Sequence, residues 1–370
     1  MNETSSLLLL GVGTAGCALA RGVRQAFGPG LRLLLTDTDA DTGADEDGFI
    51  LLGGDRLAGR GTGGDDVSGR LAAEDSMPTL DAALQGVRLA VVVTALGGGT
   101  GTGATIEIVK HLRARGLTVP VFATEPFKME GEERLRRARG ALPLVAENAN
   151  GAFFLPLDSL VQGEDNMARA LARAIDTLAA GVTLFWRLLA TPGYIRLDTE
   201  RLHRLLETAG RGHFATFTAQ GPGRAAEILD QLSRSPLPDK GTEPLQSALL
   251  GVLAGDDLRL SECATLADGV RERVGAAVPF TLATVNDEAA FADRLSVVVL
   301  LLEPSVAAHA DEKNGKAMRR VLRRNAKNGN LLAIGPQSQG GRFNNIEATY
   351  YRNENLDTPT FIRRGISIES

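Results

Sequence analysis

The stretch GGGTGTG at residues 97–103 lies between an apolar run, Leu89–Thr94, and a helical pattern at about 104–114. Glycine is disfavoured in regular structure, so five glycines in seven residues indicate a loop in close backbone contact with something else. Successive backbone N–H groups of such a loop form a concave anion site, and threonine hydroxyls add donors. It is no P-loop, because Ala104-Thr105 follows in place of a Lys-Ser/Thr pair. Since apolar elements flank it closely, we interpret it as a phosphate-binding loop rather than a flexible linker.

Apolar runs alternate with helical patterns on both sides of this loop. Leu7–Leu10 precedes one helical pattern, and Leu31–Leu35, Thr118–Thr124 and Phe153–Pro156 continue the series. Continuous apolar runs of this kind are typical of strands buried on both faces. The sequence therefore predicts an α/β fold with a parallel sheet.

A second glycine motif, Gly11-x-Gly13-x-x-Gly16, lies between the first strand and its helix. Glycines at this spacing let backbone N–H groups approach a phosphate at a helix N-terminus. Asp37 and Asp39 follow about 20 residues later, as in dinucleotide-binding folds, where an acid binds a ribose hydroxyl. Taken alone, the motif leaves dinucleotide binding and a mere tight turn both open.

The rest of the chain predicts a second domain and a tail. Apolar residues at steps of three and four indicate one amphipathic helix over 165–190, about 39 Å long at 1.5 Å per residue. Helical and apolar patterns over 191–302 predict a smaller α+β domain. Residues 303–350 are polar and rich in Gly, Asn and Gln, which indicates a linker before a terminal peptide at 351–370.

Composition argues against several classes of protein. A net charge of −5 and 5% aromatic residues disfavour bulk attraction to nucleic acid and a stacking platform for bases. Cys17 and Cys263 lack CxxC neighbours, and the four histidines lack metal-ligand spacing, so we expect no metal site built by the chain. No basic start precedes Leu7–Leu10, and no apolar run approaches the roughly 20 residues of a membrane span. We expect a cytoplasmic protein.

The motifs taken together resemble the tubulin/FtsZ superfamily, and bacterial FtsZ more than tubulin itself. The resemblance begins with the glycine run at 97–103 and covers about 1–302 plus the last 16 residues. The other matching segments, in chain order, are GVGTAGCA (11–18), TDTDA (36–40), GRGTGGDDVSGR (59–70), PFKMEGEER (126–134), PGYIRLD (192–198), SPLP (235–238), DDLRLSE (256–262) and NLDTPTFIRR (355–364).

The resemblance implies a nucleotide-binding domain at 1–164, the connecting helix at 165–190 and a second domain at 191–302. It implies GTP or GDP with Mg²⁺, subunits stacked head to tail into filaments for cell division or membrane remodelling, and hydrolysis completed at the subunit interface. Asp198 and Glu200 fall on the loop that would enter the neighbouring subunit's site. The implied nucleotide contacts are Gly13, Thr14, Ala15, Gly16, Cys17, Thr38, Gly61, Gly63, Gly97, Gly98, Gly99, Thr100, Gly101, Thr102, Gly103, Glu130, Arg134 and Asp176.

The sequence departs from the family on the side that would hold the base. Ala18, Leu157 and Ile175 stand where polar residues are expected, although Asp176 is adjacent and a shift of one residue would restore a carboxylate. A buried guanine edge without partners loses about one to a few kcal/mol per unmet group. Guanine specificity is therefore left open.

A second departure concerns hydrolysis. Arg196 and Arg201 replace an asparagine and the second carboxylate of the interface loop, while Asp198 is kept. Arginine cannot act as a base, but it neutralises phosphate charge. The loop predicts either slow hydrolysis, with Glu200 substituting, or no hydrolysis, with both arginines merely solvated.

Two tail segments suggest partners. Asp357–Arg364 is acidic, then apolar, then basic, a pattern typical of docking peptides, here for a membrane-tethering adaptor. Lys316–Lys327 is a basic helix candidate that fits either an anionic membrane or a solvated linker.

Three rival functions stay open. The chain could be a non-hydrolysing filament or a regulator of an ordinary FtsZ. It could be an NAD-dependent oxidoreductase, although no catalytic His, Lys or Tyr stands at a recognisable spacing. A nucleic-acid binder is disfavoured by diluted charge.

Overall fold

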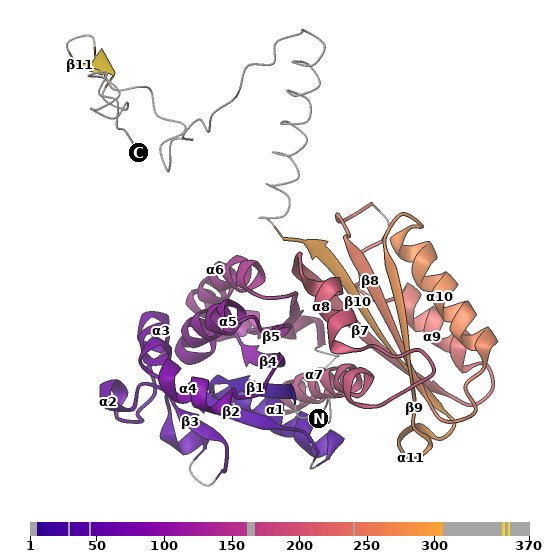
Figure 1. Cartoon of the computed structure of the whole chain (residues 1–370), viewed down its shortest axis with the longest axis horizontal. Coiled ribbons are helices and arrows are strands. Elements are labelled where there is room, and N and C mark those ends of the chain that lie inside the picture. The colour runs from indigo at the N-terminus through magenta and orange to yellow at the C-terminus, as the bar shows by residue number, and fades with distance from the viewer. Residues whose placement is uncertain are drawn as a thin grey trace, which may run out of the picture. The chain divides into compact units, whose positions relative to one another are not determined.

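The computed structural model describes residues 6–28, 30–43, 46–160, 167–239, 241–305, 350–351 and 354–355 (Figure 1). The chain divides into two units, Met1–Lys313 and Asn314–Ser370. In the second unit, β11 (Tyr350–Tyr351) and β12 (Glu354–Asn355) pair antiparallel. The segments Lys316–Lys327 and Asp357–Arg364, for which a membrane helix and a docking peptide are predicted, lie outside the described residues.

Ten strands of the first unit form one sheet in the order β3-β2-β1-β4-β5-β6-β7-β10-β8-β9. The pairs from β3 to β7 are parallel, whereas β10 is antiparallel to both β7 and β8. The predicted parallel α/β sheet is therefore confirmed. The strands are β1 (Leu7–Val12), β2 (Leu33–Asp37), β3 (Phe49–Leu51), β4 (Leu89–Ala95), β5 (Val121–Glu125), β6 (Ala152–Pro156), β7 (Ala209–Gln220), β8 (Ser247–Ala254), β9 (Phe280–Asn286) and β10 (Arg294–Pro304).

The parallel half is buried on both faces, as its continuous apolar runs predict. Successive side chains of a strand point to opposite faces, and in β1 the residues Leu7 and Leu9 join one core while Leu8 and Leu10 join another. The first core is closed by α1 (Gly13–Phe27) and α7 (Met167–Ala190). The second is closed by α3 (Asp66–Asp75), α4 (Met77–Ala83), α5 (Thr105–Ala114) and α6 (Glu132–Asn148).

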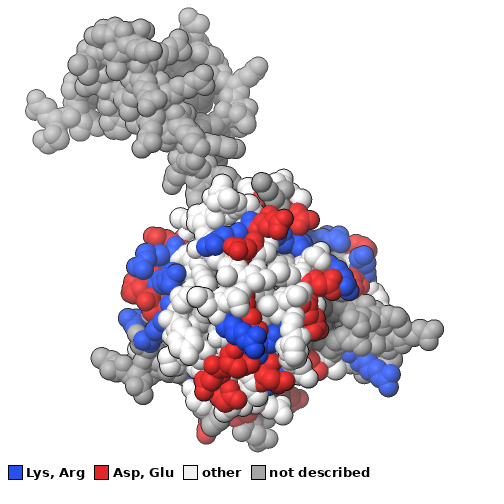
Figure 2. Space-filling view, turned by 90° about the vertical axis from the view of Figure 1, so that its right-hand side faces the viewer, with Lys and Arg blue, Asp and Glu red and all other residues white. Residues whose placement is uncertain are grey.

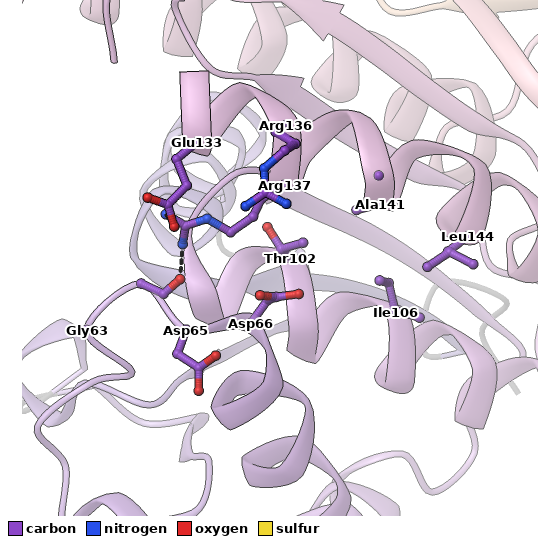
Figure 3. Close-up of a pocket in the computed structure, with 12 residues that line it drawn as sticks. Gly63, Asp65, Asp66, Thr102, Ile106, Glu133, Arg136, Arg137, Ala141 and Leu144 are labelled. Atoms are coloured by element: carbon purple, nitrogen blue, oxygen red, sulfur yellow. Dashed lines mark hydrogen bonds and ion pairs between the residues drawn. The ribbon is translucent and has the colours of Figure 1, made fainter. Parts of the chain in front are cut away.

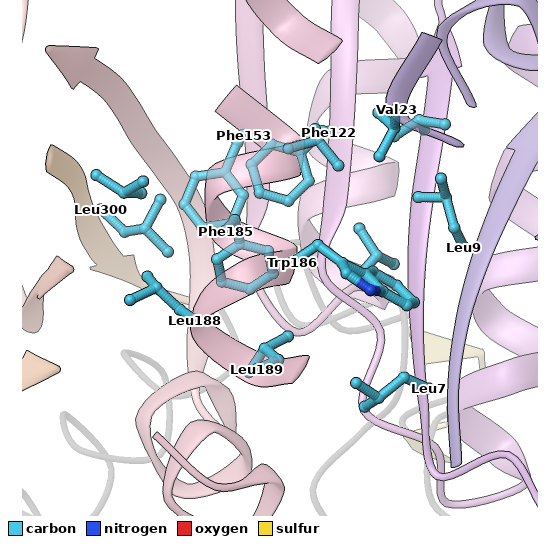
Figure 4. Close-up of a cluster of buried hydrophobic side chains, with 14 of the residues drawn as sticks. Leu7, Leu9, Val23, Phe122, Phe153, Phe185, Trp186, Leu188, Leu189 and Leu300 are labelled. Carbon is cyan, nitrogen blue, oxygen red and sulfur yellow. The ribbon is translucent and has the colours of Figure 1, made fainter. Parts of the chain in front are cut away.

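Helix α7 joins the two halves of the sheet through an aromatic cluster (Figure 4). Phe185 packs with Phe122 of β5, which lies 4.8 Å from Phe153 of β6 and 5.2 Å from Phe214 of β7 between ring centroids. Gly181 permits this approach, because an ideal Cβ there would lie 2.1 Å from the Phe214 ring. The backbone link between the halves is short: β6 and β7 pair at only two positions, Ala152↔Arg211 and Phe153↔Gly212.

The second half of the sheet packs against α9 (Arg224–Ser233) and α10 (Leu260–Val274) on its outer face. Short helix α8 (Thr199–Leu206) precedes β7. The domain boundaries predicted at 164, 190 and 302 stay predictions, because one sheet runs through both halves. On the face shown in Figure 2, acidic and basic side chains are interspersed around a largely uncharged centre. Across the described parts of the chain, every helix is too short or too polar to cross a bilayer.

Candidate functional site

A cavity of about 810 Å³ opens at the carboxyl edge of the parallel strands. Val12, Asp37 and Ala95 line it from the ends of β1, β2 and β4, and Thr124 lines it from β5. Parallel α/β sheets bind ligands at this edge, and the volume is within the range of about 300–1,000 Å³ typical of small-molecule sites. The sheet therefore places the strongest sequence motifs around one ligand-sized cavity.

Two helix N-termini converge on this cavity. Helix α1 begins at Gly13, and a π-helical turn, η3 (Thr100–Ala104), leads into α5. The first N–H groups of a helix lack intrahelical partners and carry a partial positive charge, so they attract anions. Neither α1 nor η3 has an acidic residue in its first turn. The arrangement therefore fits a phosphate chain, which is the group that the glycine motifs predict.

Most glycines of the run at 97–103 lie so close to other atoms of the protein that a side chain would not fit. An ideal Cβ would lie 2.2 Å from the Ala95 carbonyl oxygen at Gly101 and 1.9 Å from the Asp66 carbonyl oxygen at Gly103. At Gly98, by contrast, the nearest atom is Arg134 Nη2 at 3.9 Å, so this position faces open space. The close backbone contact expected of the run is thus largely with its own neighbours, and Gly98 is the glycine of the run at which an added side chain would meet open space.

Gly13 holds the two glycine loops against each other. Its φ is +75°, and an ideal Cβ would lie 3.0 Å from the backbone nitrogen of Gly101. An L side chain there would be strained and crowded at once. The first glycine motif therefore supports the second one physically.

Threonine hydroxyl groups and the buried Asp37 form a hydrogen-bonded network beside the glycine loops. Asp37 is 1% exposed and accepts hydrogen bonds from Thr14 Oγ1 at 2.8 Å, Thr42 Oγ1 at 2.7 Å and the Thr38 backbone N–H at 2.7 Å. The Thr38 and Thr100 hydroxyls are 2.6 Å apart. Both oxygens of the Asp37 carboxylate already accept hydrogen bonds from the protein. Asp37 is therefore poorly placed to bind a ribose, which counts against the oxidoreductase alternative.

Glu130 and Arg134 form an ion pair beside the glycine run, where an ideal Cβ at Gly97 would lie 2.8 Å from Arg134 Cγ. Glu130 Oε2 is 2.9 Å from Arg134 Nη1, and Glu130 Oε1 accepts a hydrogen bond from the Phe127 backbone N–H at 2.8 Å. The sequence motif identified both residues. It did not identify Arg60 and Arg137, which also line the cavity and add two cations to it.

The structure brings most of the predicted contacts to this cavity. Those that line it are Gly13, Thr14, Ala15, Thr38, Gly61, Gly63, Gly97, Gly98, Gly99, Thr100, Gly101, Glu130 and Arg134. Those that do not are Gly16, Cys17, Thr102, Gly103 and Asp176. Their roles in binding stay predictions.

The residues outside the wall have other contacts. Thr102 Oγ1 accepts a hydrogen bond from the Gly97 backbone N–H at 2.8 Å, so it shapes the loop from behind. Burial raises the pKa of the Cys17 thiol to about 12, which keeps it protonated and unreactive at neutral pH. Asp176 is exposed, and its neighbour Ile175 lines the cavity instead.

Part of the lining of the cavity is apolar. Ala18, Leu19, Leu157 and Ile175 line it, and Leu19 and Leu157 are buried. Ala18, Leu157 and Ile175 are also the positions at which the sequence departs from the family. A base would therefore meet hydrocarbon at these residues, while its phosphates would meet backbone N–H groups of the glycine loops.

The predicted catalytic residues lie apart from this cavity. Asp198 is the N-cap of α8 and accepts a hydrogen bond from the Arg201 backbone N–H at 2.6 Å. Neither Asp198 nor Glu200 lines the cavity, and both are exposed. Within the described residues, no group of three His, Cys, Asp or Glu side chains could hold a metal ion.

The loop that carries Asp198 is anchored to β9. Ile195 N donates to Thr284 Oγ1 at 2.9 Å, and Thr284 N donates to the Ile195 carbonyl at 2.8 Å. At Gly193, an ideal Cβ would lie 1.9 Å from the Thr284 carbonyl oxygen. Tyr194 nevertheless leaves 77% of its surface exposed. The loop thus presents an aromatic side chain and several charges to solvent from a fixed base.

Comparisons with known proteins agree with this geometry. Residues 6–164 match the family described as "Tubulin/FtsZ family, GTPase domain". Cell division protein FtsZ of Pseudomonas aeruginosa is 27% identical over 304 residues, which cover 80% of this chain and 77% of that protein. Cell division protein FtsZ of Pseudomonas putida is 28% identical over 268 residues, which cover 70% of this chain and 67% of that protein. These matches confirm the resemblance that the motifs indicate.

Solved structures show the same fold. The empty FtsZ dimer of M. jannaschii superposes with a TM-score of 0.74 at 23% identity, over 80% of this chain and 88% of that chain. CetZ2 from Haloferax volcanii, a GTPγS-bound protofilament, has a TM-score of 0.67 at 21% identity, over 85% of this chain and 99% of that chain. At these identities the likeness concerns the fold alone.

Proposed function

We propose that this chain is a member of the tubulin/FtsZ superfamily, that it binds GTP and GDP in the cavity at the carboxyl edge of its sheet, and that it assembles head to tail into filaments. The observation that carries the proposal is the convergence of two helix N-termini and three glycine loops on one cavity of about 810 Å³. The relatives named above are cell division proteins. We accordingly place this chain in the cytoplasm, in cell division or a related remodelling of the membrane.

Backbone groups would hold the phosphates. The first N–H groups of α1 and η3 point their positive ends at the cavity, and Gly98 leaves room beside them. Arg134 adds a cation that Glu130 keeps in place. Mg²⁺ bound with a triphosphate would supply further neutralisation of charge, and no ligand set of the chain itself is needed for it.

Hydrolysis would need a second copy of the chain. Asp198 and Glu200 lie outside the cavity of their own subunit, so they act only if a neighbouring subunit's cavity covers them. Phosphoryl transfer depends mainly on positioning and on charge stabilisation. With Arg201 in place of a second carboxylate, we expect turnover that is slow for the family.

One observation favours a second candidate, a filament or regulator that does not hydrolyse nucleotide. The Asp198 carboxylate is already engaged as the cap of α8, and the other family carboxylate is Arg201. In that case the cavity would bind nucleotide for assembly alone.

Sedimentation of the purified protein with GTP, GDP, ATP or no nucleotide, together with phosphate release, tests the proposal. We expect pelleting that depends on GTP and a slow release of phosphate from the pelleted material. Pelleting without any nucleotide supports the non-hydrolysing candidate. Protein that binds none of the nucleotides and never pellets contradicts the proposal altogether.

A pair of variants separates catalysis from helix capping at Asp198. Asparagine caps helices about as well as aspartate, whereas alanine costs about 1 kcal/mol of stability. We expect the Asp198→Asn variant to keep the melting temperature of the wild type. Its rate of phosphate release should be lower by about tenfold or more, because it lacks the carboxylate. Asp198→Ala should lose both. An Asp198→Asn variant with an unchanged rate would show that Asp198 serves only as a cap.

We further propose that the tail segment Asp357–Arg364 recruits a membrane-tethering adaptor. The support is its sequence pattern alone, since the segment lies outside the described residues. A chain truncated after residue 350 should still pellet with GTP but no longer localise to the membrane in cells. Unchanged localisation would contradict the adaptor proposal and leave nucleotide binding untouched.

A further inference from the structure

Arg137 stands at the junction of two cavities. It lies on α6, one helical turn after Arg134, and it lines the nucleotide cavity. It also lines a second cavity of about 650 Å³, whose wall includes Asp66 of α3, Thr102 of η3 and Ile106 of α5 (Figure 3). Gly63 and Gly64 belong to both cavities. One guanidinium therefore lies between the candidate nucleotide site and a neighbouring hollow.

The hydrogen-bonding capacity of Arg137 is only partly used. Nη1 donates to the Gly64 carbonyl oxygen, as the dashed line in Figure 3 shows. Nη2 lies 3.7 Å from Glu133 Oε1, whose side chain is 74% exposed, so this pair is weak. Nε is buried and has no acceptor among the described atoms. A guanidinium offers five N–H donors, and a cation with so few acceptors favours an anionic partner.

The loop that Arg137 contacts forms the wall next to the phosphate-binding run. Gly61, Gly63 and Gly64 have φ angles of +71°, +59° and +90°. An ideal Cβ at Gly63 would meet nothing within 4 Å, so this part of the loop faces open space. At Gly99 an ideal Cβ would lie 2.1 Å from Thr62 Oγ1. The loop 61–64 is thus packed on the run at 97–103 and held from behind by Arg137.

The lining of the cavity indicates which phosphate of a bound nucleotide would lie nearest to Arg137. Leu157 and Ile175 give the cavity an apolar part of its lining that suits a base, whereas the glycine loops offer backbone N–H groups that suit phosphates. A nucleotide with its phosphates on the glycine run has the loop 61–64 and Arg137 beside it in the same cavity, because Thr62 packs on Gly99 and Arg137 contacts Gly64. Arginine binds phosphate through two parallel N–H groups, which a lysine cannot do.

We propose that Arg137 recognises the terminal phosphate of a bound nucleoside triphosphate, exchanging the Gly64 carbonyl for phosphate oxygens. The site then holds a triphosphate more tightly than a diphosphate, and release of the Gly64 carbonyl changes the loop 61–64 and the wall of the second cavity. This inference rests on the nucleotide binding proposed above. It adds a residue that the family motifs in the sequence do not mark.

The affinities of the full chain for a non-hydrolysable GTP analogue and for GDP test this role. We expect Arg137→Gln to weaken binding of the analogue by about tenfold or more, the usual size of a lost charged hydrogen bond, and binding of GDP by less than about twofold. The affinity of the Arg137→Lys variant for the analogue should lie between those of the wild type and Arg137→Gln. Lysine keeps the positive charge but lacks the two parallel N–H groups of the guanidinium. Arg139→Gln is the matched control: it removes an exposed arginine of the same helix that lines neither cavity.

The ratio of the affinities for the GTP analogue and for GDP distinguishes recognition of the terminal phosphate from a general effect of the substitution on the folded protein. Equal losses for both nucleotides, or no loss for either, would overturn the inference while leaving nucleotide binding in place. Wild-type protein that binds neither nucleotide would instead overturn the proposed function. If Arg137→Gln fails to fold, the Arg137→Lys variant decides: a lowered ratio supports the inference, and a ratio equal to that of the wild type contradicts it.

Discussion

Gly98 and Gly101 are neighbours in the same glycine run, but an added side chain would meet different surroundings at each. At Gly98 a Cβ would face open space, whereas at Gly101 it would lie 2.2 Å from a backbone carbonyl oxygen. A substitution at Gly101 thus changes the fold of the loop before it changes any ligand contact. A loss of nucleotide binding in a Gly101 variant would not by itself locate the ligand.

We therefore predict opposite results for two valine variants. Gly98→Val should keep its melting temperature and lose at least about tenfold in nucleotide affinity, because two methyl groups occupy the cavity. Gly101→Val should lose about 1–3 kcal/mol of stability through overpacking. Thermal melts and fluorescent-nucleotide titrations of both variants measure this. Normal binding by a well-folded Gly98→Val would place the phosphates elsewhere.

Site residues differ in how far the sequence reveals them. The glycine loops, Glu130 and Arg134 belong to contiguous motifs, so the amino-acid sequence is enough to recognise them. Arg137 carries no motif of its own, and only the helical spacing of three residues from Arg134 hints that both share a face. Leu157 and Ile175 stand out in the sequence only as departures from the family that it resembles, and the fold shows that both line the cavity.

Among the elements, β7 is the one that the sequence hides best. Its residues, AGRGHFATFTAQ, mix glycines with charged and polar side chains, and its burial alternates only in part. A long strand with so little apolar content resembles a loop to any periodicity analysis. The sheet tolerates it because β10 supplies ten paired positions along its length. Because β7 pairs with β6 and has no clear apolar pattern, the sequence alone makes the two halves look like separate domains.

Helices α9 and α10 are joined by an ion-paired arginine at the edge of the second half. Arg224 is 3% exposed, and its guanidinium contacts Glu262 through Nε at 2.7 Å and Nη2 at 3.0 Å. Arg224 Nη1 also donates to the Asp293 carbonyl at 2.9 Å. The hydrogen bond from Arg224 holds the pKa of the Glu262 carboxyl below its ordinary value of 4.5.

This pair predicts a pH-dependent stability. Because the pKa of Glu262 is lower in the folded state, its contribution is complete above pH 4.5, the ordinary value, and is lost as pH falls through the folded pKa. We expect Glu262→Gln to lose about 2 kcal/mol at pH 7, and less as the pH drops below 4.5. Urea denaturation of both proteins across this range measures the difference. A constant difference at every pH would contradict the assignment.

At the scale of the whole molecule, the cavity and the anchored loop at 192–198 are separate features, which a second copy of the chain would bring together in the proposed filament. The sequence predicts both of them, since each belongs to a motif, and it predicts the sheet because the apolar runs are continuous. It does not predict how the halves join, which depends on aromatic contacts between residues far apart in the chain.

We predict that phosphate release per molecule rises with protein concentration, because the proposed catalytic loop belongs to a neighbour. Arg201→Asp should raise the rate at filament-forming concentrations by at least about threefold, since it restores a carboxylate beside Asp198. Arg204→Asp, on an exposed position of the same helix, is the control for charge alone. A rate independent of concentration would show that one subunit suffices or that the site is inactive.

The boundary between the two halves of the sheet, at β6 and β7, has a mechanical consequence. Only two residue pairs connect β6 to β7, and the cluster around Phe122, Phe185 and Phe214 spans the same boundary. In the proposed filament, a force between neighbouring subunits would be carried across this boundary more by the packed aromatic rings than by backbone hydrogen bonds between β6 and β7. Bending a subunit of the proposed filament would therefore require these packed rings to rearrange, so their packing would set how stiff each subunit is.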